Sequence, residues 1–235
     1  MSIVVLVVSV SGAAQARPRL PLEPIISLEV GTHTGGVNQI QASHNRQNIF
    51  TVSDDQTLRI WDAHDGQLKR VIRGPAGPRD EGALYALAQS NRFIAVAGRV
   101  GWEWGKGTTT VRLLDAKDYH ARGVLSGLPA PVSALSFSPD GKYLAAGLKG
   151  QRQGLRLYSL GTGKAAIKDL NFPAGLVDLM FLDDGRLIAL DGSGLLSFFN
   201  VKTLSKIRTL KIPKAQSTWR VSQSSDGRFL TITHQ

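Results

Sequence analysis

The segment Thr57-Leu58-Arg59-Ile60-Trp61-Asp62 decides the fold, because its pattern recurs along the chain. Each copy alternates apolar and polar residues, as a half-buried β-strand does, and ends in a bulky residue followed by a small polar one. The further copies are residues 110–115 (TVRLLD), 154–159 (GLRLYS) and 195–200 (LLSFFN). Their spacings of 53, 44 and 41 residues are typical of a repeat architecture built from one supersecondary unit, with an insertion in the second unit.

A second marker is the dipeptide Asp-Gly, which occurs between two apolar runs at Asp140-Gly141, Asp184-Gly185 and Asp226-Gly227. Asp-Gly in this setting is a strong hairpin signal, because Gly takes the positive φ that a tight turn requires. Asn45-Arg46 and Ser90-Asn91 stand at the equivalent turn of the first two units. Each unit therefore begins with a predicted β-hairpin.

A unit of about 40–45 residues with four short strands matches a β-propeller, in which four-stranded sheets stack around an axis. The 25 glycines among 235 residues suit many tight turns, and helical periodicity is almost absent. We predict an all-β chain, a β-propeller of four-stranded antiparallel blades with about five repeats, the last of them incomplete. The predicted innermost strands are residues 37–41, 84–88, 132–137, 176–181 and 219–223.

The first repeat resembles the WD-repeat (WD40) family. It has Thr32-His33 at the family's Gly-His position and closes on Trp61-Asp62. In that family a His, an Asp, a Ser or Thr, and a Trp form a buried hydrogen-bonded tetrad. The resemblance implies a structural tetrad of His33, Asp55, Ser53 (or Thr51) and Trp61. Later repeats replace the Trp by Leu114, Tyr158 and Phe199, so only the first blade keeps the set.

A narrower resemblance is to the N-terminal propeller of bacterial proteins that carry a caspase-like peptidase domain. It rests on the apolar N-terminus, on residues 70–75 (RVIRGP) with 80–86 (DEGALYA), and on the loop 101–107 (GWEWGKG). This resemblance implies a catalytic His and Cys in a peptidase domain beyond residue 235. The present chain has no cysteine.

The N-terminus has an almost unbroken apolar run at residues 3–10, followed by Ala14-Gln15-Ala16. This arrangement is typical of a signal peptide, and the run is too short to span a bilayer. Met1-Ser2 lacks the usual Lys or Arg, so the alternatives are a start codon further upstream or a buried β-strand. We predict a signal peptide at 1–16, a linker at 17–23 and the propeller at 24–235, with a periplasmic or secreted location and the cytoplasm as the alternative.

The fifth unit reaches only its second predicted strand before Gln235, while residues 25–30 form a predicted strand without a partner. In WD-repeat propellers the N-terminal strand completes the last blade. The resemblance therefore implies that residues 25–30 pair with a segment that follows Gln235. We expect the chain to be part of a longer protein.

The composition excludes several kinds of catalytic and metal-binding site. The absence of cysteine excludes disulfides, thiolate metal sites and cysteine nucleophiles, and none of the five histidines has another at metal-ligand spacing. We predict no cofactor and no metal. The net charge of +10 suits an acidic partner, but Lys and Arg are scattered, without the interleaved aromatics of nucleic-acid modules. We predict a protein or peptide partner, acidic in character, with no specific nucleic acid and no transmembrane segment in the mature chain.

A partner-binding rim is predicted from two enlarged turns, at residues 101–107 in the second unit and 149–154 in the third. In WD-repeat propellers these turns open on the side of the tetrad carboxylate. The rim comprises basic and indole side chains, which are frequent in binding hot spots: Arg99, Trp102, Trp104, Lys106, Lys149 and Arg152. The alternative is a loop whose indoles pack on its own blade.

Two functions fit these features. The first is a non-catalytic protein- or peptide-binding scaffold, the sensor or recognition part of a longer exported protein. The second is a periplasmic propeller hydrolase or lactonase with its site in the central channel. The predicted innermost strands carry one acid, Asp178, and no histidine, which favours the scaffold. We predict no catalytic residue in this chain.

Overall fold

The computed structural model describes residues 4–9, 31–73, 82–99, 109–150, 154–162, 165–170, 172, 174–203, 205–212 and 218–234. Within these ranges all regular structure is β-strand, and the strands group into five sheets. The all-β prediction is confirmed. Among the residues described, no helix is long and apolar enough to cross a membrane.

Four of the sheets are antiparallel, and each is built from four consecutive strands. The first contains β2 (Val37–Ala42), β3 (Asn48–Ser53), β4 (Thr57–Asp62) and β5 (Leu68–Arg73). The second contains β6 (Leu84–Gln89), β7 (Phe93–Gly98), β8 (Thr109–Asp115) and β9 (Ala121–Leu128). The third contains β10 (Val132–Phe137), β11 (Tyr143–Leu148), β12 (Leu155–Ser159) and β13 (Ala165–Leu170). The fourth contains β14 (Leu176–Phe181), β15 (Leu187–Asp191), β16 (Leu195–Asn200) and β17 (Ser205–Lys211).

The Asp-Gly dipeptides form the turns between the first two strands of their sheets. Gly141, Gly185 and Gly227 have φ values of 67°, 80° and 69°, which glycine adopts without a steric penalty. The carboxylate of the preceding Asp accepts a hydrogen bond from the backbone N–H two residues on, at 3.0 to 3.1 Å in all three turns. Glycine thus permits the turn and the carboxylate closes it.

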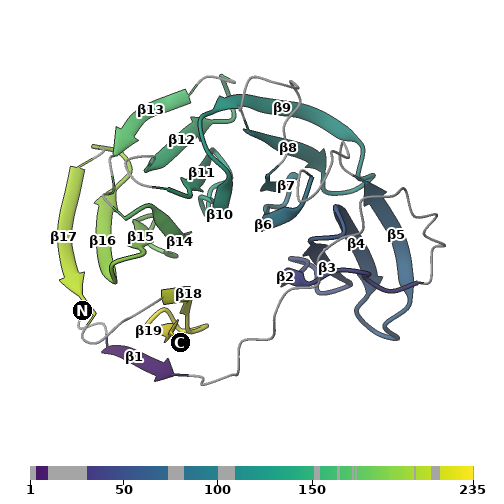
Figure 1. The fold of residues 1–235 in the computed structure, drawn as a ribbon, viewed down its shortest axis with the longest axis horizontal. Coiled ribbons are helices and arrows are strands. Elements are labelled where there is room, and N and C mark those ends of the chain that lie inside the picture. Colours follow the sequence, from purple (N-terminus) through teal and green to yellow (C-terminus); the bar gives the residue numbers. More distant parts are fainter. Residues whose placement is uncertain are drawn as a thin grey trace, which may run out of the picture.

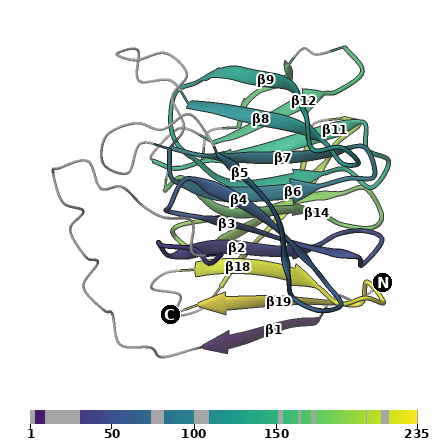
Figure 2. The same cartoon turned by 90° about the vertical axis from the view of Figure 1, so that its right-hand side faces the viewer.

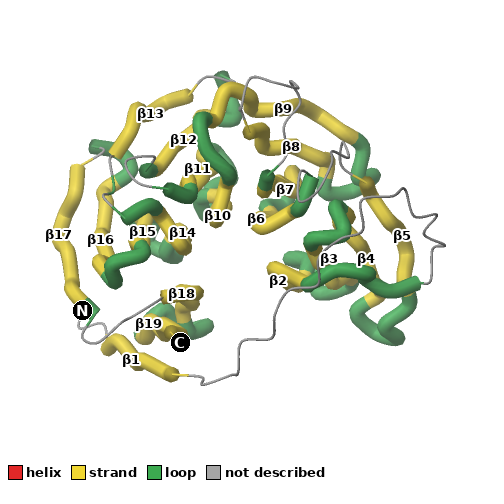
Figure 3. Tube along the Cα trace, viewed as in Figure 1, coloured by secondary structure: helices red, strands yellow, loops and turns green. Residues whose placement is uncertain are grey.

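The sheets stand around a common axis, as Figure 1 shows. The inner strands are β2, β6, β10 and β14, and the outer strands are β5, β9, β13 and β17. The Cα trace shows the same radial blades (Figure 3), and Figure 2 shows the same strands from the side. The predicted propeller of four-stranded blades is confirmed, and these four innermost strands agree with the sequence prediction to within one residue.

The core lies between neighbouring sheets. Alternate residues of each strand face the preceding or the following sheet, so each sheet buries both faces. Between the first and second sheets, Phe50 and Val52 pack with Leu84 and Leu87. Strands within the second sheet are also close, because a Cβ on Gly98 of β7 would overlap the carbonyl oxygen of Ala83, which precedes β6.

The outer strands carry part of the positive charge. β17 is mostly exposed and includes Lys206, Arg208 and Lys211 together with Ile207, which is 50% exposed. Charged side chains on an edge strand oppose pairing with the edge of another molecule. Protection of the edge strands therefore accounts for part of the net positive charge, and no bound ligand is needed to explain that part.

The fifth sheet has the order β1–β19–β18 and contains β1 (Val4–Ser9), β18 (Thr218–Gln223) and β19 (Phe229–His234). β18 and β19 are antiparallel, so the predicted hairpin of the fifth unit is confirmed. β1 pairs with β19 in parallel, from Val4 opposite Phe229 to Ser9 opposite His234. Residues 4–9 of the apolar run predicted as a signal peptide thus form a strand in this structure, which agrees with the strand that the alternative expects, while the expected burial of its side chains is not tested.

Two other predictions for the N-terminal region fall on residues 10–30. The linker at 17–23 and the unpaired strand at 25–30 both lie outside the described residues.

Candidate functional site

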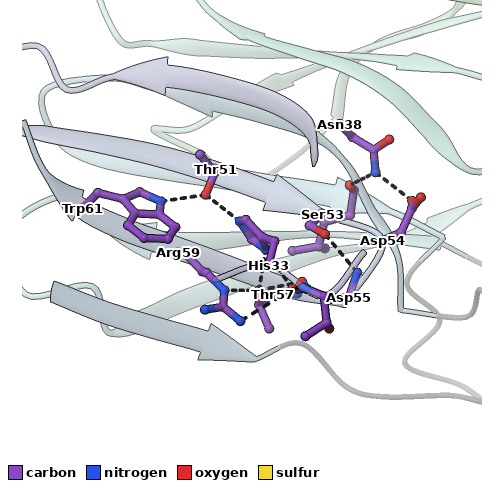
Figure 4. Close-up of polar contacts among 11 residues, drawn as sticks. His33, Asn38, Thr51, Ser53, Asp54, Asp55, Thr57, Arg59 and Trp61 are labelled. Atoms are coloured by element: carbon purple, nitrogen blue, oxygen red, sulfur yellow. Dashed lines mark hydrogen bonds and ion pairs between the residues drawn. The ribbon is translucent and has the colours of Figure 1, made fainter. Parts of the chain in front are cut away.

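A network of four side chains crosses the first sheet, on the face opposite Phe50 and Val52 (Figure 4). His33 Nδ1 lies 2.8 Å from Asp55 Oδ2, and His33 Nε2 lies 2.6 Å from Thr51 Oγ1. Trp61 Nε1 donates to the same Thr51 oxygen at 2.8 Å. An indole only donates and a carboxylate only accepts, which fixes every donor in the network. Trp61 donates to Thr51, Thr51 donates to His33, and His33 donates to Asp55.

Asp55 is the acceptor end of this network, and its side chain is 5% exposed. It also accepts hydrogen bonds from the Thr57 hydroxyl at 2.6 Å and from the Thr34 N–H at 3.1 Å. Arg59 Nη2 stands 3.6 Å away. Burial alone would raise the pKa of Asp55, but the hydrogen bonds from Thr57 and His33 hold that pKa below its usual value. The carboxylate is therefore held ionised by the fold itself.

Thr51 supplies the hydroxyl of the network. The sequence prediction preferred Ser53 for this role and named Thr51 as the alternative, so the preferred residue is wrong. Ser53 Oγ instead accepts a hydrogen bond from the Asp55 N–H at 3.1 Å, inside the turn between β3 and β4. Both hydroxyls lie on one face of β3, because they are two residues apart. Only Thr51 is within reach of both His33 and Trp61.

The later sheets have no hydroxyl at the position of Thr51. The register pairs Ile40 with Thr51 in the first sheet, and the matching partners in the next three are Val96, Ala146 and Ala189. An apolar side chain cannot bridge an imidazole and an indole. The tetrad is therefore confined to the first of these four sheets.

The predicted partner-binding rim is described in part. Arg99 follows β7 and Lys149 follows β11, so both lie where a second strand ends. The remaining members of the predicted rim lie outside the described residues: Trp102, Trp104, Lys106 and Arg152. Lys149 Nζ stands 4.0 Å from the ring centroid of Tyr85 on β6, a cation–π contact between the second and third sheets.

Tyr85 is a rim residue that sequence reasoning missed. It follows the inner-strand residue Leu84 at an irregularity in the register of β6, where its half-buried ring meets Lys149. Nearby, Gly175 has φ 72°, and a Cβ on it would lie 2.5 Å from the carbonyl oxygen of Gly150. The turns on this rim are thus packed directly against one another.

An axial cavity of about 560 Å³ is lined by the inner strands of all five sheets. Its polar lining is mostly amides and hydroxyls, with Asn38, Gln39, Gln41 and Gln89 among the amides. Gln39 is fully used by the fold, because its amide exchanges two hydrogen bonds with the backbone of Leu87. Gln41 Oε1 is a buried oxygen without a hydrogen-bond partner.

Asp178 and Arg220 are the charged groups of this lining. Asp178 accepts hydrogen bonds from the backbone N–H groups of Val221 at 2.7 Å and Leu179 at 2.9 Å, and it lies 4.0 Å from Arg220 Nη1. Arg220 Nη2 donates to the carbonyl oxygen of Asn38 at 2.8 Å. These contacts join the fourth, fifth and first sheets across the axis.

Burial raises the pKa of Asp178 to about 6, although the two N–H groups and Arg220 act in the opposite direction. A carboxyl whose pKa is higher in the folded chain favours folding in its protonated form. The stability contributed by Asp178 is therefore present below the unfolded pKa, near 3.8, and is lost as the pH rises through about 6. In the part of the chain that is described, no group of three or more acidic or histidine side chains could hold a metal ion.

Comparison with known proteins agrees with this architecture. Residues 23–62 and 122–159 match the family model WD40, described as "WD domain, G-beta repeat". These two stretches are similar to WD40 repeats. Each match ends with the third strand of a sheet, the first at Asp62 on β4 and the second at Ser159 on β12.

Several curated proteins are similar over part of the chain. Eukaryotic translation initiation factor 3 subunit I of Coccidioides immitis is 30% identical over 114 residues, which is 48% of this chain and 30% of that protein. Autophagy-related protein 16 of Arabidopsis thaliana is 22% identical over 215 residues, 78% of this chain and 41% of that protein. Protein TOPLESS-RELATED PROTEIN 2 of Oryza sativa is 38% identical over 52 residues, 21% of this chain and 5% of that protein. The chain thus spans less than half the length of these relatives.

Proposed function

We propose that this chain is a non-catalytic scaffold that binds a protein or peptide at the rim formed by Arg99, Tyr85 and Lys149. The similarity to WD40 repeats supports an interaction role, and one similar protein is named as a subunit of a larger factor, eukaryotic translation initiation factor 3. A fold alone does not decide function, so the proposal depends on the site.

The observation that carries the proposal is that structural hydrogen bonds already occupy the Asp178 carboxylate. Among the described residues it is the one carboxylate that lines the axial cavity. One of its oxygens accepts the N–H of Leu179 on its own strand, and the other accepts the N–H of Val221 on β18. A carboxylate engaged in this way positions β18 against β14. It is poorly placed to move a proton on a bound substrate.

The alternative, a hydrolase or lactonase, has the raised pKa of Asp178 in its favour, because perturbed pKa values cluster at catalytic sites. Hydrolysis also needs an activated nucleophile or water and a group that stabilises an oxyanion. The cavity lining supplies only Arg220 beside the carboxylate, and Arg220 is used by Asn38 and Asp178. The geometry therefore favours binding over catalysis.

The partner is proposed to be acidic. Lys149 and Arg99 are exposed cations at one rim, and Lys149 is held over an aromatic ring that adds apolar contact area. Complementary charge increases the rate and the specificity of association. The same proposal includes the four predicted rim residues that the structure does not describe, namely Trp102, Trp104, Lys106 and Arg152.

A photo-crosslinking residue placed at position 149 tests the proposal. We expect it to capture a defined protein when the chain is expressed in its own cell, and the same residue at the outer position 207 should not. Capture at both positions alike, or turnover of ester or lactone substrates that is lost in Asp178→Asn, would refute a scaffold that acts through the rim.

We also propose that the chain is the recognition part of a longer exported protein, in line with its resemblance to propellers that precede a caspase-like peptidase domain. The apolar run at 3–10 and the site Ala14-Gln15-Ala16 support export. The pairing of β1 with β19 supports the cytoplasmic alternative, in which the run stays in the fold. Intact-mass measurement after expression decides: export predicts loss of residues 1–16, and an uncleaved chain contradicts it.

A further inference from the structure

A tyrosine fills the groove between the first and second sheets. Tyr119 lies in the turn between β8 and β9, and its ring meets Phe50 of β3 edge-on, with 6.2 Å between the ring centroids. Its hydroxyl accepts a hydrogen bond from Asn48 Nδ2 at 3.2 Å, and the Arg70 guanidinium of β5 stands 5.9 Å from its ring centroid. An aromatic ring between an apolar wall and a guanidinium therefore closes this groove.

The register identifies the equivalents of these groups at the next interface, between the second and third sheets. In the first sheet Phe50 pairs with Ile60, which pairs with Arg70. The matching row of the second sheet consists of Ala95, Leu113 and Gly123. A methyl group and a hydrogen atom thus stand in place of the phenyl ring and the guanidinium, and a Cβ on Gly123 would meet open space.

The tyrosine itself also has no counterpart at this interface. Tyr119 is the fourth residue after Asp115, the end of β8. The fourth residue after Ser159, the end of β12, is Gly163, which lies outside the described residues. A glycine has no side chain with which to fill a groove.

The corresponding place between the second and third sheets is a cavity of about 490 Å³. Figure 1 shows these two sheets as neighbours in the ring. The apolar walls come from both sheets and consist of Phe93, Leu113, Leu125 and Leu160. Three of these side chains are only half-buried, so the cavity opens to the surface. Its volume lies within the roughly 300–1,000 Å³ that is usual for ligand-binding pockets.

Two arginines stand at the edge of this cavity. Arg92 is exposed, and its guanidinium lies 4.8 Å from the centroid of the Phe93 ring. Within the described part of the chain, the Arg92 side chain has no hydrogen bond or ion pair. Arg122, by contrast, is paired with Asp115 and Asp118. A guanidinium binds a carboxylate through two parallel hydrogen bonds, so Arg92 favours an acidic group beside the occupant of the cavity.

We propose that the cavity between the second and third sheets binds a peptide segment that presents an aromatic side chain next to an acidic one. The aromatic ring takes the place that Tyr119 fills at the preceding interface, and the carboxylate meets Arg92. The cavity lies at the end of the sheets where β7 begins, whereas the rim of the proposed function lies where β7 ends. The two surfaces are therefore separate.

Fluorescence anisotropy with the full chain and three labelled synthetic peptides of equal length tests the proposal. The first peptide has one Tyr flanked by Glu in a Ser-Gly background. The second has Ala in place of the Tyr, and the third has Gln in place of each Glu. We expect the first to bind at least about tenfold more tightly than either of the others, because a buried ring and a paired carboxylate are both needed.

Variants locate the site. Gly123→Tyr places a ring in the open space at the cavity and should weaken binding of the first peptide at least about tenfold. The matched control Val124→Tyr places the same ring on the opposite face of β9 and should bind as the wild type does. Arg92→Gln should weaken binding about tenfold, whereas Arg228→Gln, which removes a similar arginine from the ring of Phe229, should not. Arg92 is exposed, so its replacement leaves the core intact, and thermal denaturation checks every variant.

The proposal is overturned if no peptide binds, if the three peptides bind alike, or if Arg92→Gln binds as tightly as the wild type. It is also overturned if the chain self-associates in sedimentation velocity and Gly123→Tyr abolishes that association, because a second copy would then be the occupant. Arg99→Glu should leave peptide binding unchanged, which separates this cavity from the rim.

Discussion

Replacing Thr51 by Val removes the oxygen that connects His33 to Trp61, with little change in side-chain volume. His33 Nε2 then loses its donor and Trp61 Nε1 loses its acceptor, at contacts of 2.6 and 2.8 Å. A buried polar group left without a partner costs about 1–3 kcal/mol. His33 is 6% exposed, whereas Trp61 is only half-buried and can turn to water, so we expect a total loss of about 2 kcal/mol.

Urea denaturation followed by circular dichroism measures this loss. Thr51→Ser keeps the hydroxyl and should recover most of the stability, while Ser53→Ala removes only one turn contact and should cost roughly 1 kcal/mol or less. If Thr51→Val were as stable as the wild type, or if Ser53→Ala cost more than Thr51→Val, the tetrad would not be the stabilising network described above.

Three further predictions follow from packing and from charge. Gly98→Ala should cost roughly 3 kcal/mol in thermal denaturation, because its Cβ meets backbone, whereas Gly123→Ala, with open space around it, should change little. Leu87→Ala should cost about 2–5 kcal/mol and the register-equivalent Ile40→Ala about 0.5 kcal/mol or less in the same assay, because only Leu87 is buried. The melting temperature of the wild type relative to Asp178→Asn should fall as the pH rises from about 4 to about 6, and a flat difference would contradict the burial of an ionisable Asp178.

Most of the blade architecture could be predicted from the sequence, because it depends on local signals. Alternation locates the strands, and the Asp-Gly turns fix the hairpins that begin the units. The three predicted Asp-Gly turns all lie between the first two strands of a sheet, with glycine at positive φ. Such signals need no knowledge of distant residues.

The remaining features depend on contacts between residues far apart in the chain. Thr51 and Ser53 are both hydroxyls on one strand face, and only the register against Trp61 and the approach of His33 select Thr51. The bond from Arg220 to Asn38 spans 182 positions, so no local pattern predicts it. The parallel pairing of β1 with β19 is equally remote in sequence.

The sequence analysis did not predict Tyr85 as part of the rim. A tyrosine beside the first residue of an inner strand is ambiguous in sequence, because an aromatic there can face the core or the rim. The position of Lys149, on the next sheet, decides that its ring takes part in the rim.

The most direct test of the central claim, a scaffold that binds through its rim, is titration calorimetry with the purified partner captured at position 149. The variant Arg99→Glu/Lys149→Glu should bind at least about tenfold more weakly than the wild type. Lys206→Glu/Arg208→Glu, which makes the same change of charge on the outer strand β17, should bind as the wild type does. Equal weakening in both double variants would show that only net charge matters, and unchanged affinity in the rim variant would contradict the account.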